Sequence, residues 1–148
     1  AVFCLKKKTK INNIRVGISS NLSFSNKDRL ENIRRISEVS KLFINCGIIT
    51  INCFVSPSNI IRQQAEKIIG IESFIGVFIN SNLETCEKRD TKGLYKKARK
   101  GEIDNFTGIS SEFETPDESY ININTSNLSV EKSVNKLMEA IIPKIQFK

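Results

Sequence analysis

The chain has 148 residues, 39% hydrophobic and 26% charged, values that suit one globular domain with a buried core, so a single domain is expected over residues 1–148. It contains no histidine, which excludes Ser-His-Asp and Cys-His catalysis and most metal sites. The formal net charge of +7 indicates either a polyanion or a small, multiply anionic substrate, with biased coding for Ile, Asn and Lys as the alternative explanation.

The four cysteines, Cys4, Cys46, Cys53 and Cys86, form no C-x-x-C pair. Zinc ligation is therefore not expected, and reduced cysteines acting as small hydrophobic residues are the simpler interpretation. No apolar run approaches the roughly 20 residues that a membrane span needs, and "AVFCL" is too short for a signal peptide. The sequence predicts a soluble, cytoplasmic protein with no membrane partner.

The clearest predicted helix follows Ser25. Ser25 with Asp28 three residues later resembles a capping box, and apolar residues such as Ile33 and Ile36 then recur at helical spacing. Gly47 is expected to close this helix.

Short apolar runs rich in β-branched residues predict three buried strands, at residues 48–55, 74–80 and 120–125. Helices are expected at 58–69, closed near Gly70, at 83–89, and from Ser129 to about Ile142, where Pro143 should stop the last one. This alternation predicts an α/β domain with a parallel sheet. Ligands of such sheets bind beyond the carboxyl ends of the strands, which here are polar.

A basic stretch separates the last two predicted strands. Residues 90–109, "DTKGLYKKARKGEIDNFTGI", hold five cations, two aromatic residues and three glycines, without a helical or strand pattern. Such a segment either binds an anion or remains exposed to solvent without binding one.

Four segments together resemble the adenylylsulfate kinase family: "NIRVGISSNLSFSNKDRLENIRRISEVSKLF", "FVSP", "CEKRDTKGLYKKARKGEIDNFTGI" and "FETPD". The resemblance covers roughly residues 11–140. It implies a P-loop-kinase fold, a three-layer α/β sandwich with a parallel sheet. The implied reaction belongs to sulfate assimilation: transfer of the γ-phosphoryl group of ATP, with Mg²⁺, to the 3′-hydroxyl of adenosine 5′-phosphosulfate.

The resemblance also implies an acceptor site. Arg15 and Arg29 match arginines that hold the phosphosulfate, which suits the two-pronged guanidinium group, and Asn32 follows one helical turn after Arg29. Phe24 and Phe106 match aromatic residues that enclose the acceptor adenine, with Asn105 beside Phe106. Taken singly, Arg29 would be a surface charge and Phe24 a core residue; the joint match favours the site.

The remaining matched residues concern catalysis and ATP. Val55 and Ser56 lie in the strand-end motif, where Ser56 matches a phosphoserine position of the family. The basic stretch matches a lid, with Lys92, and Lys96 beside it, bringing positive charge to the phosphates. The residues matched to the surroundings of the ATP adenine are Arg89, Thr125 and Leu128.

The chain departs from the family pattern near its start. It contains no G-x-x-x-x-G-K-[ST] phosphate loop, and the two aspartates of the family's D-G-D-N motif fall on Lys10 and Asn12. The first strand and phosphate loop are therefore expected to be missing, with "AVFCL" as the nearest strand candidate, and the chain alone is expected to be inactive. A truncated chain, a mis-joined reading frame and a domain that lost catalysis all stay open.

The expected partners are adenosine 5′-phosphosulfate and ATP, in a homodimer or in a fusion to a sulfurylase. The alternative function is a non-catalytic regulatory domain that binds adenosine phosphosulfate or its 3′-phosphorylated product. A basic nucleic-acid binder is disfavoured, because the cations fall on acceptor-site motifs rather than along one face.

Overall fold

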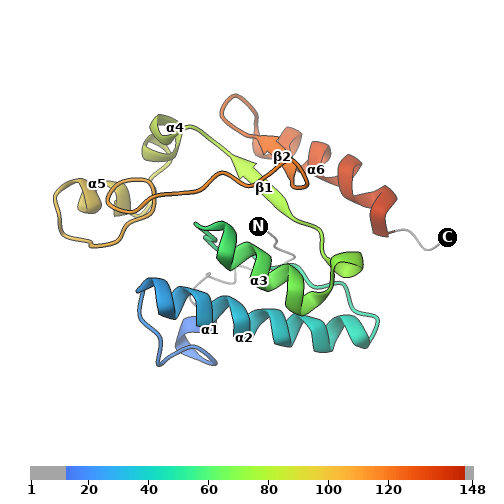
Figure 1. The fold of residues 1–148 in the computed structure, drawn as a ribbon. Coiled ribbons are helices and arrows are strands. Elements are labelled where there is room, and N and C mark those ends of the chain that lie inside the picture. The colour runs from blue at the N-terminus through green and yellow to red at the C-terminus, as the bar shows by residue number, and fades with distance from the viewer. Residues whose placement is uncertain (1–12, 146–148) are drawn as a thin grey trace.

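The computed structural model describes residues 13–145; Lys10, Asn12 and the "AVFCL" segment lie outside them. Its elements, in chain order, are α1 (Asn13–Val16), α2 (Asn26–Asn45), α3 (Asn59–Ile69), the 3-10 helix η1 (Ile71–Ser73), β1 (Val77–Asn80), α4 (Leu83–Lys88), α5 (Leu94–Arg99), β2 (Ile121–Asn124) and α6 (Val130–Ile145). Figure 1 shows α2 and α3 side by side in one layer, the two strands in the next, and α6 on the far side. The predicted three-layer α/β fold is confirmed.

The two strands form a parallel pair, in register from Val77 opposite Ile121 to Asn80 opposite Asn124. Parallel strands need a long crossover, and residues 81–120 supply it. Because side chains alternate across a strand, Val77 and Ile123 can face the same side of the pair, where they form a buried cluster with Ile141 of α6. This cluster is the core that holds α6 on the sheet.

Helix α2 follows its sequence signals closely. The Ser25 hydroxyl accepts a hydrogen bond of 3.1 Å from the backbone N–H of Asp28, as the predicted capping box requires. Ile33 and Ile36 are buried at helical spacing, and α2 packs against α3, where Ile61 is buried. Full burial of each such side chain contributes about 1.5–3 kcal/mol. Gly47, with a φ of 75°, follows the helix end in the left-handed conformation that favours glycine.

The prediction of a strand at 48–55 was wrong. The segment is not part of a ladder, and among residues 13–145 only β1 and β2 pair in a sheet. A side-chain hydrogen bond of 3.0 Å, from Asn52 to Ser40, holds the segment against α2 instead. An apolar run alone does not make a strand, because a strand needs a neighbouring backbone to pair with, and here Ile48, Ile49 and Val55 are exposed. The other two predicted strands are present but shorter, at 77–80 and 121–124.

The final helix begins as predicted but ends later. The Ser129 hydroxyl accepts a hydrogen bond of 3.2 Å from the N–H of Lys132. Helix α6 then continues through Pro143 to Ile145. Proline removes one donor and normally breaks a helix interior, yet in the described part of α6 only two residues follow it. Ile145 packs against the Val77–Ile123–Ile141 cluster, and this burial favours the extra residues.

Candidate functional site

The site is built where the N-terminal end of α2 meets the segment from residue 90 to residue 115, which we call the basic loop. Figure 1 shows the basic loop projecting past the carboxyl end of β1, on the same side of the molecule as the start of α2. The two regions touch through Arg29 and Asn105, where a hydrogen bond of 3.1 Å joins Nη2 to the backbone carbonyl.

Arg29 lies in the first turn of α2 and is partly buried. Its Nε donates a hydrogen bond of 3.0 Å to the carbonyl of Phe24. Burial, and to a lesser degree the nearby charge of Arg15, lowers the pKa of Arg29. An arginine remains charged at neutral pH, so the site holds a partly desolvated cation.

Arg15 approaches the same place from α1. Its Nη1 donates hydrogen bonds to the carbonyls of Leu22, at 3.2 Å, and Ser23, at 2.7 Å. Its guanidinium carbon lies 4.3 Å from the centroid of the Phe24 ring, and that of Arg29 lies 5.7 Å from the same centroid. Two cations therefore converge on one aromatic ring that is 60% exposed. We call Arg15, Phe24 and Arg29 the arginine cluster.

The basic loop contributes Asn105 and Phe106. Asn105 has a φ of 54°, a left-handed conformation that asparagine tolerates better than most residues. The Phe106 ring meets Tyr95 edge-on, with centroids 4.9 Å apart, while the Phe24 ring meets the two arginines. The structure thus brings the Asn105 carbonyl to the arginine cluster and gives the two phenylalanine rings separate partners.

Asn32 lies one helical turn after Arg29 and is only 4% exposed. Within the described residues its Oδ1 has no hydrogen-bond partner. A buried acceptor without a partner costs about 1–3 kcal/mol, so a ligand that donated to it would recover that cost. Asn32 was predicted as a substrate contact, and this stays a prediction.

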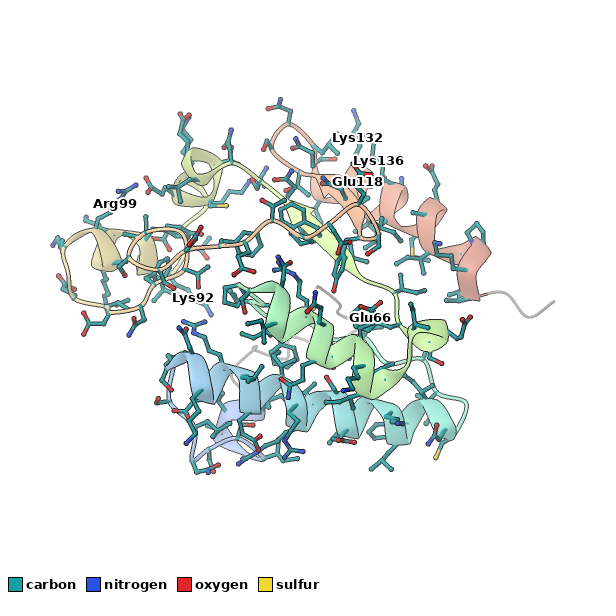
Figure 2. The ribbon with its side chains drawn as sticks, viewed as in Figure 1. Glu66, Lys92, Arg99, Glu118, Lys132 and Lys136 are labelled. Atoms are coloured by element: carbon teal, nitrogen blue, oxygen red, sulfur yellow. The ribbon has the colours of Figure 1, made fainter. Side chains whose placement is uncertain are left out.

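The basic loop contains a helix, α5, which the sequence analysis did not predict. Asp90 explains it: the carboxylate accepts hydrogen bonds from the backbone N–H groups of Leu94, at 2.9 Å, and Tyr95, at 2.8 Å. Figure 2 shows Lys92 on the side of the loop that faces α2 and Arg99 on the opposite side. Arg99 forms an ion pair of 2.7 Å with Glu87, whereas Lys92 and Lys96 are exposed.

The three residues matched to the ATP adenine region also come together, at the carboxyl end of β2. Arg89 donates hydrogen bonds to the backbone carbonyls of Thr125, at 2.9 Å, and Ser126, at 3.4 Å. The N–H of Leu128 donates to the carbonyl of Thr125 at 3.3 Å. Arg89 therefore fixes the start of the basic loop to the end of a strand.

The F-V-S-P motif, which follows no strand in the structure, contains one exposed and one buried site residue. Val55 is 58% exposed, while Ser56 is 6% exposed. The Ser56 carbonyl accepts a hydrogen bond of 2.6 Å from Arg62, a residue that the sequence analysis did not single out.

A pocket of about 280 Å³ lies elsewhere, lined by Phe78, Pro116, Asp117, Glu118, Tyr120 and Asn122. It includes none of the predicted site residues. Its two carboxylates would repel a multiply anionic ligand, so the pocket is a poor candidate for the site.

Comparison with known proteins decides the family. Residues 7–124 match the family model "Adenylylsulphate kinase". The chain belongs to the adenylylsulfate kinase family. It is 60% identical over 136 residues to an adenylyl-sulfate kinase of Bacteroides thetaiotaomicron, covering 92% of this chain and 68% of that one. With an adenylyl-sulfate kinase of Clostridium kluyveri it shares 47% identity over 134 residues, covering 90% of this chain and 67% of the relative.

Solved structures are also similar to this chain. A Mycobacterium tuberculosis APS kinase, determined in complex with AMPPNP and APS, superposes with a TM-score of 0.82 at 35% identity, over 89% of this chain and 77% of that one. A second structure, APE1195, gives a TM-score of 0.79 at 33% identity, over 90% of this chain and 75% of its own. The chain spans about two thirds of the length of the curated relatives it matches.

Adenylylsulfate kinases as a family act with ATP, and Mg²⁺ is implied with it. Within residues 13–145, no group of three or more His, Cys, Asp or Glu side chains could hold a metal ion. None of the helices in this part of the chain is long and apolar enough to cross a membrane.

Proposed function

We propose that this chain supplies the acceptor-binding part of an adenylylsulfate kinase, the enzyme that transfers the γ-phosphoryl group of ATP to the 3′-hydroxyl of adenosine 5′-phosphosulfate. One observation carries the proposal. Arg15 and Arg29 converge on Phe24, and Arg29 is bonded to Asn105 of the basic loop at 3.1 Å.

The chemistry of this arrangement fits a small anion attached to a flat ring. Two guanidinium groups at one place match a ligand with adjacent anionic groups, such as phosphate bonded to sulfate. The exposed Phe24 ring and the neighbouring Phe106 segment offer aromatic surface to an adenine. A nucleic-acid polymer would instead need cations spread along a face, whereas these cations converge on one ring.

Other residues complete the proposed site. Lys92, on the α2 side of the basic loop, would add a third cation when the loop closes over the phosphates. Val55 and Ser56 would form the wall beside the acceptor. Arg89, Thr125 and Leu128, held together at the end of β2, would border the adenine of ATP.

We further propose that these 148 residues bind the acceptor without transferring phosphate. The sequence contains no G-x-x-x-x-G-K-[ST] segment, whose backbone N–H groups would cradle the triphosphate of ATP. A regulatory domain that binds adenosine phosphosulfate or its 3′-phosphorylated product stays as the second candidate function, and the departures at Lys10 and Asn12 favour it.

Calorimetric titration of the chain with four ligands tests the proposal: adenosine 5′-phosphosulfate, its 3′-phosphorylated product, AMP and a short RNA. Acceptor binding requires the phosphosulfate to bind more tightly than AMP, which lacks the sulfate. Tighter binding of the 3′-phosphorylated product than of adenosine phosphosulfate would favour the regulatory function. Tight RNA binding that weakens steeply with salt would contradict both.

A further inference from the structure

Arg62 of α3 is the most buried arginine among the described residues, at 3% exposure. Its Nη1 donates a hydrogen bond of 2.6 Å to the carbonyl of Ser56, in the F-V-S-P motif. Its Nη2 donates one of 2.7 Å to the carbonyl of Glu114. One guanidinium group therefore joins the Ser56 segment to Glu114 at the end of the basic loop, and Glu114 lies 52 residues after Arg62 in sequence.

Further contacts hold the same two segments together. The backbone N–H of Glu114 donates to the carbonyl of Pro57 at 2.8 Å. The Glu114 carboxylate accepts a hydrogen bond of 2.6 Å from the N–H of Asn59. The Arg62 guanidinium also lies 5.7 Å from the centroid of the Phe113 ring. The end of the basic loop is thus fixed to residues 57–62 by backbone and side-chain contacts alike.

Burial of the Arg62 guanidinium is energetically unfavourable, so a contribution to stability does not by itself explain it. Burial lowers the pKa of Arg62, with Tyr120, Glu114 and Asp117 opposing the shift. The two nitrogens that are bonded donate to backbone carbonyls and to Asn59 Oδ1, and the buried Nε has no partner within the described residues. Apolar residues packed in such a place are often as stable as a buried charge, so the guanidinium is better explained by the geometry that it imposes.

The two ends of the basic loop have matching anchors. Arg89 fixes its start to the carbonyls at the end of β2. Arg62 fixes its end to the carbonyl of Ser56. Between these anchors lie Lys92, Asn105 and Phe106, so the positions of the anchors decide where those residues can reach.

We propose that Arg62 is a positioning residue: it sets the end of the basic loop against Ser56 and so aims Asn105 and Phe106 at the arginine cluster. This inference rests on the proposed function, in which that cluster binds adenosine 5′-phosphosulfate. Arg62 itself acts through Ser56 and Glu114 rather than by touching the ligand.

The test compares wild-type chain with Arg62→Gln, Arg62→Lys and the control Arg34→Gln. Arg34 is an exposed arginine of α2 that pairs with Glu31 at 2.7 Å. Titration with adenosine 5′-phosphosulfate should show at least a tenfold loss of affinity in Arg62→Gln. Arg62→Lys should recover part of this loss, because an ammonium group can donate to the carbonyls but cannot span them as a planar fork does. Arg34→Gln should stay within about twofold of wild type.

Hydrogen exchange separates positioning from general support of the fold. In wild type, saturating adenosine 5′-phosphosulfate should slow exchange in residues 103–112. In Arg62→Gln this ligand-induced protection should be lost, while α2 and α6 exchange as in wild type. Unchanged affinity in a folded Arg62→Gln chain, or exchange that rises equally throughout the chain, would overturn the proposal.

A second variant keeps the test decisive if Arg62→Gln does not fold. Glu114→Ala removes the carboxylate that accepts from Asn59 but keeps the backbone carbonyl that Arg62 uses. A loss of affinity in the same direction, but smaller, is expected; wild-type affinity in both Glu114→Ala and Arg62→Lys would refute the positioning role. Absence of binding by the wild-type chain would instead refute the proposed function. In that case faster exchange of residues 113–116 in ligand-free Arg62→Gln would still support the anchor, and unchanged exchange there would overturn it.

Discussion

Arg29 and Asn105 are joined across 76 residues of sequence by a hydrogen bond of 3.1 Å from the guanidinium to the backbone carbonyl. The same guanidinium donates to the carbonyl of Phe24 at 3.0 Å. Arg29 is therefore both a member of the arginine cluster and the link between that cluster and the basic loop. A ligand anion that competes for this guanidinium would change the contact to Asn105, which couples binding to the position of the loop.

Replacement of Arg29 by alanine should weaken binding of adenosine 5′-phosphosulfate by at least about 2 kcal/mol, roughly thirtyfold, because truncation of a partly desolvated charge removes charge-assisted hydrogen bonds. Isothermal titration calorimetry measures the loss. Arg34→Ala is the matched control, since Arg34 lies on the same helix and its guanidinium bonds to Glu31 instead. Equal losses in the two variants would show that general positive charge, and not the arginine cluster, drives binding.

Replacement of Phe24 by leucine should weaken the same binding by about 1 kcal/mol or more, roughly fivefold, because aromatic stacking on a base contributes about 1–3 kcal/mol. The stability of the fold should hardly change, since the ring is 60% exposed. Phe43→Leu, at an exposed phenylalanine within α2, is the control and should bind like wild type. Wild-type affinity in Phe24→Leu would remove the ring from the site.

The elements that the sequence predicted well are those whose signals are local. The signals for α2 lie within the helix or directly beside it: the Ser25 cap, the apolar spacing of Ile33 and Ile36, and Gly47 after its end. Helix α2 formed as expected. Residues 48–55 carried an equally clear apolar signal, yet a strand also depends on a neighbour that the run itself does not encode. At Pro143, too, a contact that is distant in sequence decided the outcome. Packing of Ile145 against the core outweighed the tendency of proline to end the helix.

The site residues predicted from the sequence are those that match the family motifs. The structure connects several of them by hydrogen bonds, such as Arg29 with Asn105 and Arg89 with Thr125. The sequence analysis did not identify Arg62. Its partners are the backbone carbonyls of Ser56 and Glu114, and backbone carbonyls leave no signal in a sequence because every residue has one. Asp90 left one weak signal, a carboxylate four residues before the start of α5, and its three N–H contacts appear only in the structure.

The basic loop should become better protected when the acceptor binds. Few of its side chains are apolar and much of its backbone is exposed, so exchange of its amides should be fast without ligand. Adenosine 5′-phosphosulfate should slow exchange across residues 90–115, as measured by mass spectrometry, and Lys92→Ala should reduce that effect. Lys67→Ala, an exposed lysine of α3, serves as the control. Equal protection with and without ligand would contradict a closing loop.

The two tyrosines should titrate well above their ordinary range. Burial raises the pKa of Tyr95 and of Tyr120 to about 12, from an ordinary value of 10.0. Between pH of about 10 and 12 the unfolded chain would release protons that the folded chain keeps, so the free energy of unfolding should fall as pH rises. Absorbance of tyrosinate should show midpoints near 12 in the folded chain and near 10 in urea. Tyr95→Phe should halve the signal and reduce the loss of stability; a folded-state midpoint near 10 would contradict the burial of both rings.

We expect this chain to differ from the rest of the family most clearly in its rate of phosphoryl transfer. Phosphoryl transfer depends almost wholly on positioning and on neutralisation of charge, and the 148 residues contain no glycine-rich loop to hold the triphosphate. The positions that match the family's aspartates hold Lys10 and Asn12, and neither side chain can act as a carboxylate base. Loss of one preorganised electrostatic group costs roughly 10²–10³ in rate, so loss of two would bring turnover near the background of most assays.

The purified chain, given adenosine 5′-phosphosulfate and ATP with Mg²⁺, should therefore release no ADP in a coupled assay, while calorimetry of the same preparation detects the acceptor. The active control is a full-length adenylylsulfate kinase under identical conditions. Turnover near one per second would mean that this chain holds the ATP phosphates through residues outside the segments that match the family. The proposed acceptor site would survive that result, because binding of the acceptor by Arg15, Phe24 and Arg29 would not depend on where the phosphoryl group comes from.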